Sequence, residues 1–194
     1  MEGWIALAVI VALAVWAVTI YNGLVALRNR YKNSWAQIDV QLKRRYDLIP
    51  NLVEAAKGYL THEKETLERV IAARGAAMGA AQKAAAAPGD AAAMQGLAQA
   101  EGQLGGAMGR LMAVFEAYPD LKANQNFLAL QEELSATESK IAYARQFYND
   151  QVMLLNTKIQ SFPSNLIASM FGYKAHEFFN IDDAAARGPA EVSF

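Results

Sequence analysis

The first 27 residues constrain this chain most, because they contain a long apolar stretch without a single charge. Residues 3–27 carry no Asp, Glu, Lys or Arg, and residues 3–20 read GWIALAVIVALAVWAVTI. An α-helix rises 1.5 Å per residue, so about 20 such residues cover the roughly 30 Å hydrocarbon core of a bilayer. Trp4, and towards the other end Trp16 and Tyr21, suit the aromatic belts of the two membrane interfaces. We therefore expect the lipid bilayer to be the partner of residues 3–27.

This stretch differs from a cleavable signal peptide. A signal peptide has a basic first segment, a shorter apolar core and a small-x-small cleavage site. Here Met1 and Glu2 precede the core, and TIYNGLVALRNR follows it. The sequence therefore predicts a retained anchor.

Basic residues behind the anchor predict its orientation. Arg28, Arg30 and Lys32 follow it directly, residues 43–45 read KRR, and Asp39 is the only acidic residue in between. Cytoplasmic flanks of transmembrane helices carry an excess of Lys and Arg, so we expect the N-terminus outside and the rest of the chain in the cytoplasm. These membrane-proximal cations can also attract anionic headgroups, whereas residues 43–45 read equally well as a solvated helix face.

The composition excludes several classes of function. A net charge of −1 over 194 residues argues against nucleic-acid binding, which needs a broad basic surface. The chain has no cysteine, so disulfides, thiolate metal sites and a cysteine nucleophile are excluded. The two histidines, His62 and His176, are too few for a His-based site, and residues 62–66 (HEKET) lack the second ligand of a zinc-protease helix. We expect no catalytic residues, no cofactor and no metal site, and hence a protein that is not an enzyme.

Apolar residues recur at helical spacing after the anchor. A wide stripe that includes Trp35, Ile38 and Leu42 continues it without a separating Gly or Pro after Gly23. The simplest interpretation is one helix over about residues 3–83. Pro50 removes one backbone hydrogen bond within it, which predicts a kink just before that residue.

Three further helices are expected. Pro88-Gly89 marks a turn, and Asp90 is a candidate N-cap of a helix that ends near Tyr118. The next helix has an apolar seam in which each residue follows the previous one by seven positions, as in a coiled coil. The seam consists of Phe127, Leu134, Ile141, Tyr148, Leu155 and Phe162. A short fourth helix is expected over residues 165–171.

These elements predict an all-α fold, in which a single N-terminal transmembrane helix continues into an antiparallel helical bundle with long coiled-coil-like helices. The expected parts are the exterior residues and anchor (1–27), a cytoplasmic bundle (28–180) and a flexible tail (181–194). The second helix is too short to cover its two longer neighbours. Part of the stripe over residues 35–42, or the seam over residues 155–162, therefore has to contact the fourth helix, the membrane or another subunit. We favour another subunit, because a large exposed apolar stripe is unusual on a soluble monomer, and this predicts a homo-oligomer in which the stripe and the seam supply the contact or packing residues.

Two regions are candidates for contact with a partner. Tyr143, Arg145 and Asn149 form a polar-aromatic cluster, although Arg145 could simply pair with Glu138 on its own helix or with a glutamate on an adjacent helix. Phe194 ends a tail that could dock on a partner as an extended peptide.

The short fourth helix has an apolar face that could cap the bundle, contact a subunit or lie on a membrane, and the lack of a basic polar face favours the first two. This face contains Leu166, Ile167, Met170, Phe171 and Tyr173.

Three segments resemble the LemA family of bacterial membrane proteins. They are residues 21–59 (YNGLVALRNRYKNSWAQIDVQLKRRYDLIPNLVEAAKGY), 117–150 (AYPDLKANQNFLALQEELSATESKIAYARQFYND) and 161–173 (SFPSNLIASMFGY). The resemblance implies a bacterial inner-membrane protein with one transmembrane helix, a short exterior N-terminus and a cytoplasmic helical bundle. It carries over no catalytic residue. Relatives are often encoded near membrane metalloproteases, and one branch is implicated in forming magnetosome membranes.

Two functions therefore compete. The first is a membrane-anchored, non-enzymatic scaffold that self-associates at the cytoplasmic face and organises or shapes the membrane. The alternative is an adaptor or regulator of an integral membrane partner, such as a membrane metalloprotease.

Overall fold

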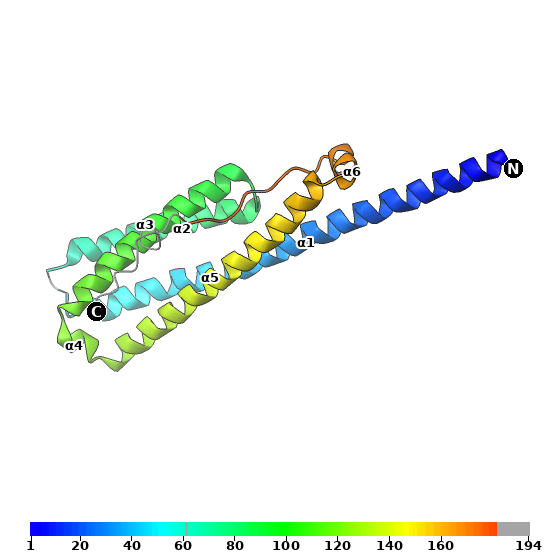
Figure 1. Ribbon diagram of the computed structural model, residues 1–194. Helices are drawn as coiled ribbons and strands as arrows, with labels where there is room; N and C mark the ends of the chain where they lie inside the picture. Colours follow the sequence, from blue (N-terminus) through cyan, green and yellow to red (C-terminus); the bar gives the residue numbers. More distant parts are fainter. Residues whose placement is uncertain (61, 182–194) are drawn as a thin grey trace, which may run out of the picture.

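The computed structural model describes residues 1–60 and 62–181, and over these ranges it consists of helices joined by turns and one extended segment, without a strand. The helices are α1 (Glu2–Lys57), α2 (Lys64–Ala86), α3 (Ala91–Glu116), α4 (Pro119–Lys122), α5 (Gln125–Gln160) and α6 (Ser164–Met170). The long helices α1 and α5 lie side by side and antiparallel, and the α2–α3 hairpin packs along them (Figure 1). The predicted all-α bundle with one long apolar N-terminal helix is confirmed.

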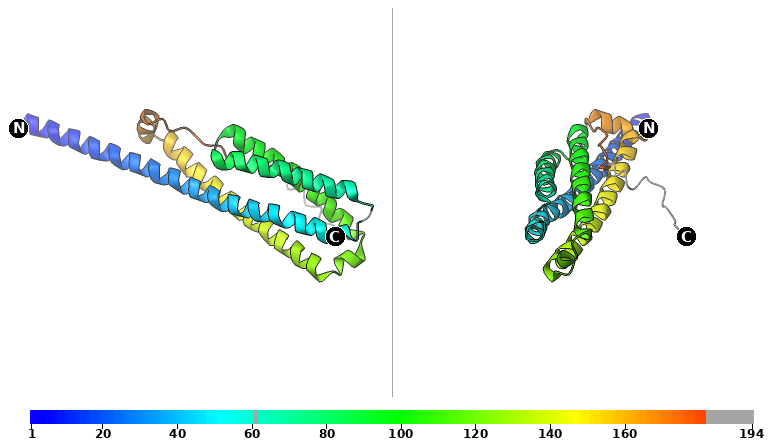
Figure 2. Two further views of the ribbon diagram at one scale, coloured as in Figure 1. Left: turned by 180° about the vertical axis from the view of Figure 1, so that it is seen from behind. Right: turned by 90° about the vertical axis from the view of Figure 1, so that its left-hand side faces the viewer.

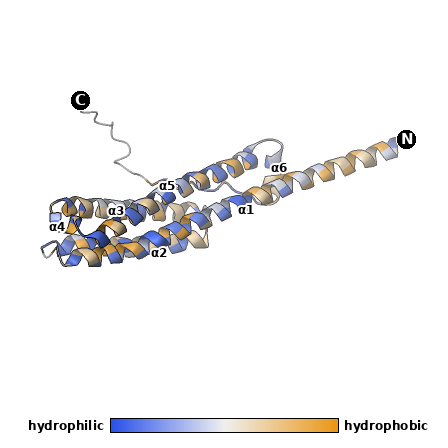
Figure 3. Ribbon diagram, turned by 90° about the horizontal axis from the view of Figure 1, so that it is seen from below, coloured by the Kyte–Doolittle hydropathy of each residue, from blue (hydrophilic) through white to orange (hydrophobic). Residues whose placement is uncertain are grey.

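The N-terminal third of α1 extends beyond the rest of the molecule (Figure 2). This third is largely hydrophobic along its length (Figure 3). Among the described residues, α1 is the one helix that is long and apolar enough to cross a membrane. Burial in the bundle begins at Ile20 and is complete at Leu24. The same helix then supplies the apolar stripe of the bundle, so the apolar N-terminal segment and the bundle share one continuous backbone.

The first helix does not reach residue 83 as the periodicity suggests, because α1 ends at Lys57 and α2 begins at Lys64. The backbone N–H groups of Tyr59 and Leu60 both donate to the Ala56 carbonyl, which closes the last turn. Leu60 is buried, so the chain folds back into the core at this point. The reversal lets the apolar residues of α2 pack against α1 and α3, which a straight extension of α1 would leave uncovered.

Pro50 lies within α1, and the helix continues through it. Proline has no N–H, so the carbonyl of Tyr46, four residues earlier, loses its usual helical donor. The Arg74 side chain of α2 donates to this carbonyl from its Nε instead. A contact between two helices thus replaces a bond within one.

The boundaries of α3 and α6 agree closely with the sequence prediction, whereas the short helix α4 was not predicted. Asp90 caps α3, since its side chain accepts a hydrogen bond from the Ala93 N–H at 2.9 Å. Asn124 caps α5 in the same way by accepting from Asn126 and Phe127. Helix α6 covers Ser164–Met170, close to the range expected for a short fourth helix.

An extended segment follows α6 and returns along the bundle. We call residues 174–181 the strap. It runs between α5 and the α2–α3 turn, and its Glu177 N–H donates to the Gly89 carbonyl at 2.9 Å. The strap therefore covers the part of the long helices that α2 and α3 do not reach.

Candidate interaction surfaces

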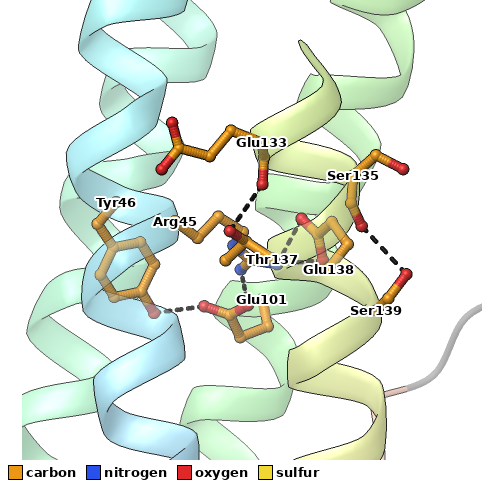
Figure 4. A network of polar contacts seen from close by, with 8 residues as sticks. All are labelled: Arg45, Tyr46, Glu101, Glu133, Ser135, Thr137, Glu138 and Ser139. Atoms are coloured by element: carbon orange, nitrogen blue, oxygen red, sulfur yellow. Dashed lines mark hydrogen bonds and ion pairs between the residues drawn. The ribbon is translucent and has the colours of Figure 1, made fainter. Parts of the chain in front are cut away.

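A buried polar network connects α1, α3 and α5 (Figure 4). The Arg45 guanidinium donates to carboxylates of Glu101 and Glu138, with its Nη1 3.0 and 3.1 Å from the two Glu138 oxygens. Glu101 also accepts a hydrogen bond from the Tyr46 hydroxyl. The side chains of Arg45 and Glu101 are 6% and 0% exposed, so this ion pair is closed to solvent. Burial raises the pKa of Tyr46 to about 12, which keeps its hydroxyl a donor.

This network is suited to positioning helices. A buried charge is costly unless it is paired. The network therefore fixes how far α1, α3 and α5 can slide past one another, because Arg45, Glu101 and Glu138 have to meet. Glu101 lies too deep for a solute to reach. Within residues 1–60 and 62–181, no three His, Asp or Glu side chains cluster as a metal site would need.

Two asparagines of α5 hold the strap by its main chain. The Asn156 side chain accepts from the His176 N–H and donates to the His176 carbonyl, both at 2.9 Å. Asn149 makes the equivalent pair with Phe179, at 2.8 and 3.2 Å. The two asparagines are seven residues apart, or about two helical turns, so they stand on one face of α5. The strap is bound as an extended peptide would be, through its backbone.

Side chains of the strap also enter the core. Phe179 is buried 5.9 Å from the Trp35 ring, and the His176 ring lies 4.5 Å from that of Tyr31. Burial lowers the pKa of His176, and the nearby positive charges of Arg28 and Lys32 lower it further. A hydrogen bond with the Gly89 backbone acts in the opposite direction and raises this pKa.

The α2–α3 turn is shaped to receive the strap. Gly89 has a φ of +82°, and a Cβ at this position would lie 2.7 Å from His176 Nδ1. Only glycine meets both conditions. On α5, the buried Tyr148 hydroxyl donates to the Glu177 carbonyl at 3.1 Å, and burial raises the pKa of this tyrosine.

The structure places the predicted seam inside a single chain. Phe127, Leu134, Ile141, Tyr148 and Leu155 are all buried. Phe162, the last member, is 79% exposed because α5 ends at Gln160, before the repeat does.

The expectation that the stripe on α1 needs another subunit is wrong for Trp35, Ile38 and Leu42, which are buried within one chain. The physical reason is that α5 runs the length of the stripe and the strap fills the remaining gap. The Trp35 ring, for example, lies 5.5 Å from that of Tyr148. Any contact between copies has to use other residues.

An exposed apolar surface of the bundle lies between α1 and α5. It forms a depression of about 630 Å³, and we call it the lateral face. Val40, Tyr143 and Phe147 project from it, and Tyr143 is 75% exposed. Its lining residues are Ala36, Gln37, Val40, Gln41, Lys140, Tyr143, Ala144 and Phe147.

The predicted polar-aromatic cluster is only partly available to a partner. Tyr143 and Arg145 line a second depression of about 550 Å³, which continues to Asn180 and Ile181. Arg145 forms no described ion pair with Glu138, which pairs with Arg45 instead. Asn149 is occupied by the strap, and Phe194 lies outside the described residues.

The predicted membrane-proximal cations are exposed on α1. Arg28, Arg30 and Lys32 follow the first buried turn of the helix. The Arg28 guanidinium lies 5.6 Å from the centre of the Tyr173 ring. No described acidic side chain pairs with these three cations.

Sequence reasoning missed three elements of this arrangement: the strap, the buried Arg45–Glu101 pair and the Arg74 contact. The spacing of Asn149 and Asn156 was the available signal for the strap, since polar residues seven apart share a helix face.

These features define a class of helical-bundle protein whose first helix begins with an apolar segment of membrane-spanning length and then enters the bundle. The LemA family model matches residues 34–194, and the chain belongs to the LemA family.

The chain is also similar to individual curated proteins. Magnetosome proteins MamQ 2 and MamQ 1 of Paramagnetospirillum magneticum are each 29% identical to it over 175 residues, which is 82% of this chain and 64% of each relative. Protein LemA of Metamycoplasma hominis is 28% identical over 147 residues, which is 76% of this chain and 63% of that protein. The chain thus spans less than two thirds of the length of these relatives.

Proposed function

We propose that this protein is a membrane-anchored, non-enzymatic scaffold whose bundle self-associates at the cytoplasmic face of the bacterial inner membrane. The observation that carries the proposal is the continuity of α1, a helix of 56 residues and about 84 Å. Its exposed apolar part suits a bilayer, and its remainder forms the core of the bundle. Because no linker separates the two, the position of the anchor sets the position of the bundle.

The lateral face is the surface proposed for self-association. Val40 follows Ile20 by 20 residues, so the face lies about 30 Å along α1 from the end of the anchor. Copies that share one membrane and one orientation have their lateral faces at the same distance from the membrane surface. Like faces can therefore meet side by side, as a symmetric contact requires. Confinement to a membrane also raises the effective concentration of the copies.

The test is the particle mass of the full-length protein in mild detergent, measured by light scattering. Phe147→Asp puts a charge on the lateral face and should reduce the wild-type assembly towards a single chain. Leu128→Asp is the matched control, because Leu128 lies on the same helix with a similar exposure, 43% against 46% for Phe147. A wild-type protein that is already a monomer, or an equal mass in both variants, would reject self-association through this face.

The proposed orientation has an independent test, because the chain has no native cysteine. A single cysteine at Ala86, an exposed residue at the end of α2, should resist an impermeant maleimide in intact cells and react after lysis. Labelling in intact cells would instead place the bundle outside.

The second candidate function is an adaptor for an integral membrane partner such as a membrane metalloprotease. The polar depression beside Arg145 favours it, because its lining combines charged, amide and aromatic side chains that a protein partner can contact. The adaptor would use this depression and the tail that ends at Phe194 to hold its partner. Removal of residues 182–194, or Arg145→Ala, should abolish co-purification of the metalloprotease while the particle mass stays unchanged. Equal recovery of the protease with either variant would reject the adaptor.

A further inference from the structure

Helix α6 packs against α1 where the apolar anchor meets the bundle. The ring of Tyr21 lies 4.5 Å from that of Phe171 and 6.5 Å from that of Tyr173. Ile20 and Leu24, the first buried residues of α1, lie at the same level. Figure 1 shows α6 beside α1 at the point where the N-terminal part of α1 leaves the bundle.

Most of the large apolar residues of this region are exposed, although Ile167 and Tyr173 are partly buried against the core. Helix α6 buries only Ser164 and Ala168. The exposed residues are Phe162 (79%), Leu166 (56%), Met170 (75%) and Phe171 (55%). A helix in water normally buries its large apolar side chains, whereas α6 leaves Leu166 and Met170 exposed and buries only part of Ile167. The sequence alone favours a cap or a subunit contact, but Ser164, Ala168 and part of Ile167 form the cap, which leaves most of the apolar face uncovered.

The depth of α6 along α1 matches a membrane boundary. A hydrocarbon core of about 30 Å takes about 20 helical residues, so a span that begins at Gly3 ends near residue 22. This is the level of Tyr21 and Leu24, against which α6 packs. The exposed apolar residues of α6 therefore lie where headgroups meet acyl chains, and they continue the apolar surface of the anchor.

The charges around α6 suit a lipid surface. Residues 161–173 contain no charged residue, and the next residue is Lys174. Arg28 lies beside Tyr173, and the exposed Arg30 and Lys32 follow on α1. Apolar groups would thus sit at the acyl boundary with cations behind them at the level of lipid phosphates, and no carboxylate would have to enter the interface.

We infer that α6, with Phe162 and Phe171 at its two ends, is a second membrane-contacting element that inserts into the interface of the leaflet facing the bundle. This inference rests on the proposed function in one respect, namely that α1 spans a bilayer. With two attachment points, the bundle can neither rotate about α1 nor change its tilt freely. The lateral face would then hold a fixed direction relative to the membrane.

The test uses the full-length protein in vesicles of neutral and anionic phospholipid. A single cysteine at Met170 is labelled with an environment-sensitive fluorophore, and lipids brominated on the acyl chain serve as quenchers. Val11→Cys, in the anchor, is the positive control, and Gln125→Cys, at the far end of the bundle, is the negative control. We expect a loss of fluorescence at Met170 and Val11 and none at Gln125.

The outcomes separate this inference from the proposed function. Quenching at Val11 without quenching at Met170 would overturn the role of α6 and leave the anchor intact. No quenching at Val11 would overturn both. A blue-shifted Met170 label that lipid does not quench would assign the face to a second copy of the chain and overturn the membrane contact. Leu166→Cys, one turn earlier on the same exposed face, repeats the measurement if the first label disturbs folding.

Discussion

The side chain of Arg74 donates a hydrogen bond to the main-chain carbonyl of Tyr46, the carbonyl that Pro50 leaves without a helical donor. Replacing Arg74 in α2 therefore affects the stability of α1, the helix that begins with the apolar N-terminal segment. The contact also ties α2 to α1 close to the Arg45 network.

The first prediction follows from this contact. Arg74→Met should lower the free energy of unfolding by about 1–3 kcal/mol, because a partly buried carbonyl loses its donor. In a Pro50→Ala background the same change should cost clearly less, since the N–H of the new alanine can donate to the Tyr46 carbonyl. Denaturant unfolding of the four proteins in this cycle measures the coupling. Equal costs in both backgrounds would mean that Arg74 contributes only packing.

The second prediction concerns the buried ion pair. Arg45→Met should lower the free energy of unfolding by about 3–5 kcal/mol, because Glu101 stays buried with only the Tyr46 hydroxyl as a partner. The double variant Arg45→Met with Glu101→Met should recover part of this loss, since no unpaired charge remains. Thermal and denaturant unfolding measure both effects.

A neighbouring residue supplies the control for this prediction. Arg44 pairs with Glu133 at 2.7 Å, but both side chains are more than 40% exposed. Arg44→Met should therefore change stability by only about 0–1 kcal/mol. Similar losses at Arg44 and Arg45 would contradict the role assigned to burial.

The third prediction tests the attachment of the strap. Asn149→Leu removes both hydrogen bonds to Phe179, each worth about 1 kcal/mol net, so the Phe179 amide should exchange with solvent roughly 30-fold faster. Asn156→Leu should act in the same way on the His176 amide. Gln146→Leu, an exposed change on the same helix, is the control. Unchanged exchange in the asparagine variants would mean that side-chain burial alone holds the strap.

The parts of the fold predicted from sequence are those with a regular pattern. The seven-residue repeat located the core positions of α5 because a helix returns the same face at that spacing. The uncharged stretch predicts the part of α1 that is long and apolar enough to cross a bilayer, because its length matches the hydrocarbon core. Phe162 shows the limit of such patterns, since the repeat continues for one position after α5 has ended.

Other parts depend on contacts that no local pattern records. The apolar stripe runs on past Lys57, and packing of α2 against α1 and α3 favours the reversal of the chain at Leu60. The strap has no periodicity, and its partners on α5 are asparagines that read locally as exposed polar positions. For the same reason a coiled-coil-like seam does not reveal whether its partner is another copy or the same chain, and here Phe127, Leu134, Ile141, Tyr148 and Leu155 are buried within one chain.

The last prediction is a pH dependence of strap attachment that comes from His176. Its pKa is lowered in the folded protein by burial and by Arg28 and Lys32, whereas the detached strap has the ordinary value of about 6.5. As the pH falls below 6.5, the detached form therefore binds a proton before the folded form does, and stability drops, by less than about 1.4 kcal/mol per pH unit. Unfolding free energies measured between pH 7.5 and 5.0 should show this slope. His176→Gln retains a polar side chain that does not titrate, so it should remove this part of the slope and leave the contributions of all other groups. The same slope in both proteins would show that the strap does not sense pH through His176.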